Sequence, residues 1–287
     1  MLVVPVLRPD GPVLLFGGCY SNLEATNALL AEASRLGIPP GRIVCTGDVV
    51  AYCADAAATV QSIRAAGIHV VMGNCEESLG GYAEDCGCGF DPGTACDRLS
   101  NAWYAHADAT LDADAREWMR GLPQRIDLIF GSRRLAVVHG SPERINEFVF
   151  ASASDDELSR HIVSASCDGV IGGHCGIPFT RIVGGSLWHN PGAIGMPAND
   201  GTARVWFSVL EASDQGVRIR HHPLEYDHHA SAMAMRQTNL PGEYAQALQS
   251  GLWPSLDVLP PMEFAQTGQP LTLGTILWPN SDCLVRT

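Results

Sequence analysis

The chain contains no lysine: all 18 of its basic residues are arginine, in a sequence of 287 residues with 31 acidic residues. Without lysine there is neither a P-loop lysine nor a Schiff-base lysine, so P-loop nucleotide hydrolysis and imine chemistry are excluded. The formal net charge of -13 repels a phosphate backbone. We therefore expect no general nucleic-acid binding.

Long apolar runs and a secretory signal are also missing. No run approaches the roughly 20 apolar residues that cross a membrane, so we expect no membrane association. Residues 1–8 lack a basic stretch and contain Pro5, which argues against a signal peptide. Ten cysteines in such a chain favour a reducing compartment, and we predict a cytoplasmic protein.

Apolar runs alternate with amphipathic segments along most of the chain, a pattern typical of an α/β fold. Strands are predicted at residues 13–16, 42–46, 69–72, 135–138, 169–172, 204–210 and 217–221. Helices are predicted at residues 22–36, 56–66, 155–164 and 230–250, the last broken near Pro241 and Gly242.

Two regions depart from this alternation. Residues 80–121 begin with glycine- and cysteine-rich loops and continue as a helical stretch, and we interpret them as an insertion lying over the functional site. Residues 252–287 are rich in Pro, Gly and Thr and predict a C-terminal tail that packs on the core or is partly disordered. The rest, residues 1–251, is predicted to form one domain.

Four short segments follow predicted strands, and each places a polar side chain at the carboxyl end of its strand. They are Thr46-Gly47-Asp48, Gly73-Asn74-Cys75-Glu76, Val138-His139-Gly140-Ser141 and Gly173-His174-Cys175-Gly176. A carboxylate, an amide and two imidazoles are the mixed ligands that suit Zn, Fe or Mn. The sequence therefore predicts a divalent-metal site formed by Asp48, Asn74, His139 and His174.

The order and spacing of these segments resemble the calcineurin-like metallophosphoesterase family, in particular its branch of small bacterial phosphodiesterases and diadenosine-polyphosphate hydrolases. The similarity runs from Val13 to Gly251 and includes Asn190-Pro191-Gly192-Ala193. It implies a four-layer αββα sandwich with the metal site at the strand ends. It also implies hydrolysis of a small phosphorylated substrate, a mono- or diester that includes nucleotide-like compounds, by a metal-bound hydroxide.

The first of the family's two metal sites is incomplete in this chain. Gly18 and Tyr20 occupy the positions of the opening Asp-x-His motif, and Gly176 replaces the last histidine of Gly-His-x-His. Three donors are therefore missing, and we expect one ion rather than two. His189, just before the Asn190 turn, is a candidate replacement ligand, with a hydrogen-bonded strand-end histidine as the alternative.

Other candidate residues surround the predicted ligands. Cys75 stands where the family has a histidine that aids leaving-group protonation, so Cys75 and His139 are candidate catalytic residues, and Cys75 is also a candidate ligand. Tyr20 either contacts the substrate phosphate or packs in the space of the first metal. Asn22 is expected to cap the helix that follows it and to contact the substrate.

Three functions remain open at this level, the last of them a purely structural protein that acts through the tail from Trp253 onward and holds no metal. The first is a metal-dependent phosphoesterase with a reduced metal site. The second is a non-catalytic metal- or phosphate-binding or redox-sensing protein on the same fold, because donors are missing and Cys86, Cys88 and Cys96 lie near Cys75 in the sequence. The sequence leaves open whether the protein is an oligomer.

Overall fold

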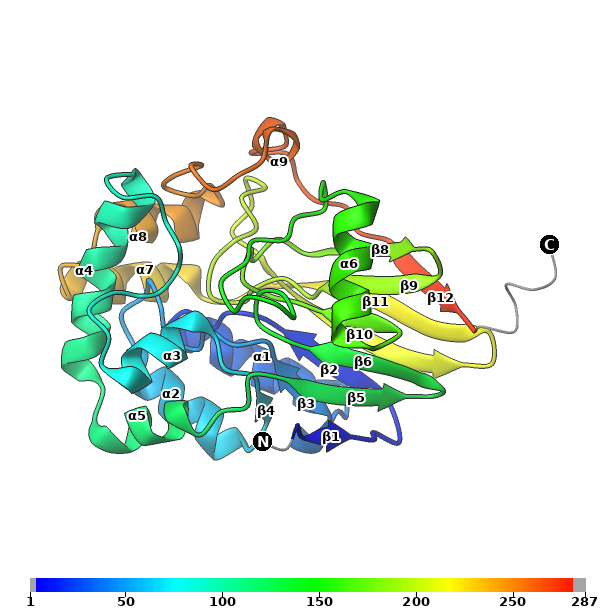
Figure 1. Ribbon diagram of the computed structural model, residues 1–287. Helices are drawn as coiled ribbons and strands as arrows, with labels where there is room; N and C mark the ends of the chain where they lie inside the picture. Colours follow the sequence, from blue (N-terminus) through cyan, green and yellow to red (C-terminus); the bar gives the residue numbers. More distant parts are fainter. Residues whose placement is uncertain (1–3, 281–287) are drawn as a thin grey trace.

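Two six-stranded mixed sheets form the centre of the fold (Figure 1). The computed structural model describes residues 4–280; residues 1–3 and 281–287, which include the end of the predicted tail, lie outside the described residues. The first sheet has the order β1 (Val6–Leu7), β5 (Ile126–Phe130), β6 (Arg133–Val137), β7 (Gly169–Ile171), β9 (Ser186–Asn190) and β8 (Phe179–Val183). The second has the order β12 (Thr275–Pro279), β11 (Gly216–Leu224), β10 (Val205–Ser213), β2 (Val13–Phe16), β3 (Ile43–Cys45) and β4 (His69–Val70).

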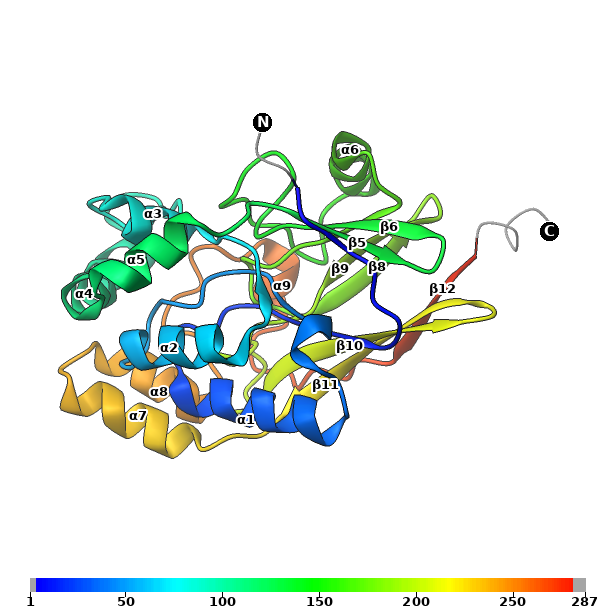
Figure 2. The same cartoon turned by 90° about the horizontal axis from the view of Figure 1, so that it is seen from below.

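Helices cover the outer faces of both sheets and one end of the sandwich. They are α1 (Leu23–Arg35), α2 (Ala56–Ala66), α3 (Asn74–Gly81), α4 (Ala95–Thr110), α5 (Ala113–Arg120), α6 (Asp155–Ala165), α7 (His228–Gln237), α8 (Gly242–Ser250) and α9 (Pro261–Ala265), with a 3-10 turn at Pro40–Arg42. Figure 2 shows α6 on the outer side of the first sheet and α1 on the outer side of the second.

The alternation of side chains along the central strands explains the layers. In β2, Val13 and Leu15 face the other sheet, whereas Leu14 and Phe16 pack with the helices α1 and α2. In β6, Ala136 packs with α6 on the other outer face. Successive residues of a strand point to opposite faces, so strands that are apolar throughout bury both sides. The predicted four-layer αββα class is confirmed.

Most predicted elements are present, and the departures lie where periodicity is weak. The sequence did not predict β5, the helix α3 that begins at Asn74, or β12. The strand β12 pairs with β11 and buries Trp278 completely, so residues of the predicted tail complete the second sheet. The 80–121 segment contains α4 and α5, and α5 packs on α3. Among residues 4–280, no helix has the length and apolar character needed to span a bilayer.

Candidate metal centre

The four predicted ligands lie at the edge where the parallel strands of both sheets end. Asp48 follows β3 and Asn74 begins α3 after β4, in the second sheet, while His139 follows β6 and His174 follows β7, in the first. The carboxyl ends of parallel strands meet at one edge of a sheet, which is where α/β proteins form their sites. Gly17 forms a parallel bridge with Ala193 and joins the two sheets at this edge.

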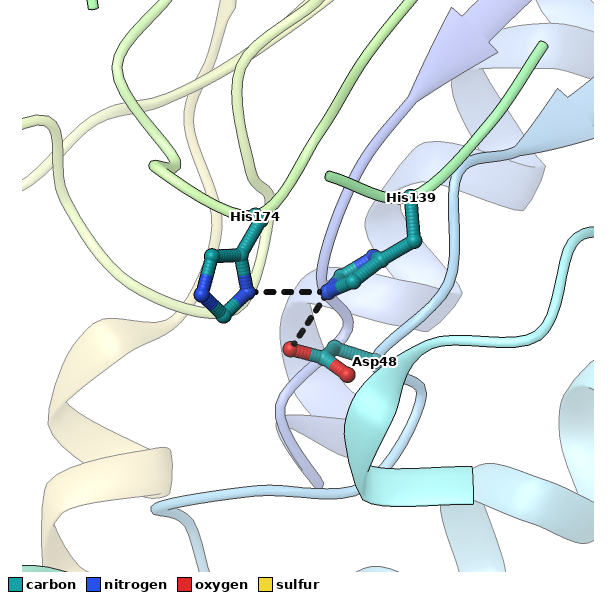
Figure 3. A group of neighbouring side chains, drawn as sticks. All are labelled: Asp48, His139 and His174. Atoms are coloured by element: carbon teal, nitrogen blue, oxygen red, sulfur yellow. Dashed lines mark hydrogen bonds and ion pairs between the residues drawn. The ribbon is translucent and has the colours of Figure 1, made fainter. Parts of the chain in front are cut away.

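These side chains converge on one atom, the Nε2 of His139. It lies 3.2 Å from Asp48 Oδ2, 3.0 Å from Asn74 Oδ1 and 3.0 Å from His174 Nδ1. Figure 3 shows the His174 ring nitrogen and the Asp48 carboxylate turned toward the His139 ring. Neighbouring ligands of a metal bound at about 2.1 Å are separated by roughly 3.0 to 3.4 Å, so the spacing suits one ion.

The chemistry of the four donors also fits a cation. Three acceptors face one ring nitrogen, and a single N–H cannot donate a good hydrogen bond to all three. Asp48, Asn74 and His139 are almost completely buried, so their lone pairs have little access to water. The residues present therefore match the needs of a divalent metal, which would accept all four lone pairs at once.

The backbone selects the metal-binding tautomer of His139. Its Nδ1 lies 2.7 Å from the carbonyl oxygen of Thr46, so Nδ1 carries the proton and Nε2 keeps a lone pair when the ring is neutral. Burial alone would lower the pKa of His139, but the Asp48 carboxylate, the Thr46 carbonyl and the Glu76 charge together outweigh it and leave this pKa above its ordinary value. A proton on Nε2 of His139 thus supplies the positive charge beside Asp48 that a bound metal would otherwise supply.

The second imidazole is neutral. Burial, together with the neighbouring His139, lowers the pKa of His174 to about 3. Its Nδ1 is therefore free to act as a ligand at neutral pH. The ring of Phe148 lies against it, with 4.2 Å between the ring centroids, and limits its rotation.

Asp48 is fixed by the first turn of α3. Its Oδ1 accepts a hydrogen bond from the Cys75 N–H at 3.2 Å, which leaves Oδ2 for His139. The loops approach so closely that a Cβ on Gly73 would lie 2.5 Å from the Asp48 nitrogen and closer still to Oδ1. Glycine is required at position 73 because only a residue without a side chain allows this approach.

Glu76 is a residue of the centre that sequence reasoning missed. Its buried carboxylate accepts backbone hydrogen bonds from Asp48 at 2.8 Å, Gly73 at 3.0 Å and Val50 at 3.3 Å. Burial and the nearby Asp48 charge raise the pKa of Glu76 to about 7. By accepting the Gly73 N–H, Glu76 forms the acidic half of a capping box at the start of α3. Gly73 has no side chain to form the other half, so the sequence carried only a weak signal for this role.

The amide of Asn74 is oriented by the 80–121 segment. Its Nδ2 donates to the Cys86 carbonyl at 2.9 Å and lies 3.4 Å from Cys88 Sγ. With the nitrogen held on that side, Oδ1 faces His139. The 80–121 segment therefore contributes to the centre by fixing one ligand.

The comparisons with known proteins agree with this geometry. A model of the calcineurin-like phosphoesterase superfamily domain matches residues 19–215. The chain belongs to this superfamily. The uncharacterized protein MJ0912 of Methanocaldococcus jannaschii is 25% identical in an alignment 232 residues long that covers 75% of this chain and 88% of that protein.

Two solved structures show the same fold at low identity. A metallophosphoesterase from Sphaerobacter thermophilus has a TM-score of 0.65 and 23% identity, and the hypothetical protein PH1004 from Pyrococcus horikoshii has a TM-score of 0.70 and 17% identity. Each match covers 84% of this chain and 99% of the other. Divalent-metal use is implied by membership of this superfamily.

An aromatic ring lies where this member of the superfamily lacks the donors of the first metal. A Cβ on Gly18 would lie 2.7 Å from Cε2 of Tyr20 and closer still to Cζ and Cε1. A Cβ on Gly176 would lie 3.5 Å from the Tyr20 hydroxyl oxygen. Tyr20 therefore fills the space between the two glycines, and its contact with substrate stays a prediction.

Cys75 does not join the ligand group that Asp48, His139 and His174 form. Its side chain is buried beside Cys88, and the Asn74 Nδ2 lies 3.6 Å from its sulfur. Burial, reinforced by the Asp48 charge, holds the pKa of the Cys75 thiol well above its usual value. Both the ligand role and the general-acid role predicted for Cys75 are therefore unsupported by its environment.

His189 is also absent from the group. Its Nε2 lies 2.7 Å from Ser208 Oγ and its Nδ1 lies 2.8 Å from Thr180 Oγ1. Strand alternation explains this position, because His189 shares the inner face of β9 with Leu187, between the sheets. The alternative of a hydrogen-bonded strand-end histidine describes His189 correctly, and the replacement-ligand prediction is wrong.

Asn22 has a structural role. Its Oδ1 caps α1 by accepting from the Ala25 N–H at 3.2 Å and also accepts from the Ser231 hydroxyl at 2.7 Å. Its Nδ2 donates to the Gly195 carbonyl at 3.0 Å and lies 3.3 Å from the Tyr226 hydroxyl. The predicted cap is present, but the buried amide has no capacity left for the predicted substrate contact.

A second group of potential ligands lies away from this centre, formed by Glu143, Glu147 and His161. Arg144 pairs with Glu147 at 2.6 Å, and Arg160 lies 3.7 Å from Glu143. The two guanidinium groups balance the two carboxylates, so this group gives little attraction for a cation.

Proposed function

We propose that this protein hydrolyses a phosphate monoester or diester of a small substrate with one divalent transition metal, Zn, Fe or Mn. The supporting observation is the convergence of Asp48, Asn74 and His174 on Nε2 of His139, within a chain of the calcineurin-like phosphoesterase superfamily. The nucleotide-like substrates implied by the sequence belong to this class.

When bound, the metal supplies Lewis-acid activation of the phosphoryl group and of the attacking water. The residues of the chain hold it. Asp48 brings a negative charge, and the Thr46 carbonyl keeps the Nε2 lone pair of His139 available. His174 binds as a neutral imidazole. In this proposal the Tyr20 hydroxyl, which lies next to Gly176, contacts the substrate.

The space occupied by Tyr20 supports one ion over two. Gly18 and Gly176 provide no side-chain donor, and the tyrosine ring fills the volume that a second ion and its ligands would need. A single ion can still polarise a phosphoryl oxygen and orient the substrate.

A specific observation favours a second candidate, a redox-sensing protein without turnover. The buried thiols of Cys75 and Cys88 lie 3.6 and 3.4 Å from the amide nitrogen of Asn74, and the carbonyl of the buried Cys86 accepts a hydrogen bond from it. Their oxidation would disturb a metal ligand. However, burial holds the pKa of the Cys75 and Cys88 thiols well above the usual value, which disfavours the reactive thiolate. Hydrolysis is therefore the function we favour.

Two ligand variants with matched controls test the proposal. Asp48→Ala and His174→Ala remove ligands, whereas Asp114→Ala and His229→Ala remove the same groups from exposed positions. We expect wild type and controls to contain about one metal per chain and to hydrolyse p-nitrophenyl phosphate or its bis ester. The two ligand variants should bind metal more weakly by more than the 10- to 100-fold that is typical when a residue hydrogen-bonded to a ligand is changed.

Metal content is measured by plasma mass spectrometry and turnover by released nitrophenol. Unchanged metal and turnover in both ligand variants would contradict the proposal. Bound metal without turnover in wild type, combined with a spectral or conformational response to peroxide, would favour the redox-sensing candidate.

A further inference from the structure

A hollow lined mainly by apolar side chains opens directly beside the metal centre. His174, Phe148 and Tyr20 line it, the 80–121 segment adds Phe90 and Leu99, and the C-terminal residues add Trp253 and Val258. His174 belongs both to the hollow and to the ligand group, so the two adjoin each other at this residue. Among residues 4–280, no Arg, Asp or Glu lines the hollow.

The walls of this hollow are fixed by hydrogen bonds. The Trp253 indole N–H donates to the Pro197 carbonyl at 2.6 Å, and its backbone N–H donates to Asn199 Oδ1 at 2.9 Å. The carboxylate of Asp257 accepts from the Ala95 N–H at 3.0 Å and so ties the C-terminal wall to the beginning of α4. A preorganised wall loses little freedom when a ligand binds.

Aromatic rings stand on two sides. The centroid of the Phe148 ring lies 4.2 Å from that of the His174 ring and 6.4 Å from that of the Phe90 ring. The centroid of the Tyr20 ring lies 4.8 Å from that of the Tyr52 ring. Such rings favour another aromatic group in an offset or edge-to-face arrangement. An aromatic ring is thus a better occupant than a polar chain.

The size of the hollow and the charge around it further limit which ligands it can take. The hollow is partly open and has a volume of about 70 Å³, about half of the about 150 Å³ of an apolar cavity known to hold benzene. It therefore takes one edge of a single ring, whereas the larger body of a nucleoside with its ribose would lie mostly outside it. Within the described part of the chain, no arginine lines the hollow to neutralise additional phosphates, and the net charge of -13 repels them.

We propose that the centre acts on phosphoesters of small uncharged phenols, with the ring in this hollow and the phosphate at the metal ligands. The inference rests on the proposed function. Hydrolysis breaks the bond between phosphorus and the aryl oxygen, water supplies the new oxygen on phosphorus, and the phenol leaves with the proton. The ring, rather than a nucleoside, then determines which esters are accepted.

The test uses non-hydrolysable phosphonates, so that it has a readout other than turnover. Binding of methylphosphonate, phenylphosphonate and 4-carboxyphenylphosphonate to the metal-loaded protein is measured by calorimetry. Phenylphosphonate should bind roughly tenfold to a hundredfold more tightly than methylphosphonate, the gain expected from burying part of a ring. The carboxylate on 4-carboxyphenylphosphonate should remove this gain.

A blocking variant checks the location. Val258→Trp fills the hollow and should abolish the preference for phenylphosphonate, whereas Val163→Trp, at an exposed position of α6, should keep it. Equal affinities for methyl- and phenylphosphonate in wild type, including no measurable binding of either, would overturn the inference, as would tighter binding of 4-carboxyphenylphosphonate. Selective phenylphosphonate binding without turnover of any phosphoester would instead contradict the proposed function alone.

Discussion

Replacement of Gly18 by alanine tests whether Tyr20 occupies the space of the first metal. The added Cβ would meet three atoms of the Tyr20 ring, at 2.7 Å or less. Carbon atoms prefer separations of about 3.5 to 4.0 Å, so the ring would have to move by roughly 1 Å or more. The ring cannot move freely, since Tyr52 packs against it at 4.8 Å between centroids.

Gly18→Ala should lower the free energy of unfolding by about 3 kcal/mol, the upper end of the usual range for an overpacked core. Tyr20→Ala removes the ring and should itself cost about 3 to 5 kcal/mol, because an almost fully buried aromatic side chain is lost. In the Tyr20→Ala background the Cβ at position 18 no longer meets a ring. Gly18→Ala should then be close to neutral, giving a coupling energy of about 2 to 3 kcal/mol.

The four proteins of this cycle are unfolded with urea, and the free energies are obtained from the midpoints at a common slope. Gly81→Ala is the matched control, since a Cβ there meets no atom and the change should be neutral or slightly stabilising. An equal cost of Gly18→Ala in the two backgrounds, or no cost in either, would refute our account of the first metal site.

Three further changes have distinct expected outcomes. Asn74→Asp should weaken metal binding despite its added charge, as seen by competition with a chelator, because a carboxylate cannot donate to the Cys86 carbonyl. Asn22→Ala should lower the free energy of unfolding by about 2 kcal/mol through loss of the cap and its buried bonds, without changing KM. Although burial acts in the opposite direction, hydrogen bonds including that from the Leu271 N–H keep the pKa of Asp200 below its ordinary value. The stability that ionised Asp200 contributes is present above about pH 4 and is lost as the pH falls through its pKa in the folded protein. Asp200→Asn should therefore reduce the fall in the free energy of unfolding at acid pH. An unchanged dependence on acid pH would count against this.

The ligand positions were predictable from the sequence because each follows an apolar strand. Parallel strands end at one edge, so Asp48, Asn74, His139 and His174 needed only the correct sheet assignment to come together. The glycines at 18 and 176 also indicated a changed first site.

Long-range packing was not predictable in the same way. The direction of His189 depends on which face of β9 lies between the sheets, and a run that is apolar on both faces does not reveal it. The walls of the hollow come from Phe90, Leu99, Trp253 and Val258, which belong to segments without periodicity. Their meeting is fixed by tertiary hydrogen bonds such as that between Asp257 and Ala95.

An anomalous-scattering map of crystals grown with Zn or Mn, recorded at the absorption edge of that metal, tests the central claim most directly. We predict one peak, at about 2.0 to 2.3 Å from donor atoms of Asp48, Asn74, His139 and His174, with the Tyr20 ring in the neighbouring space. The absence of a peak among these four side chains, or a second peak in the place of the Tyr20 ring, would contradict it.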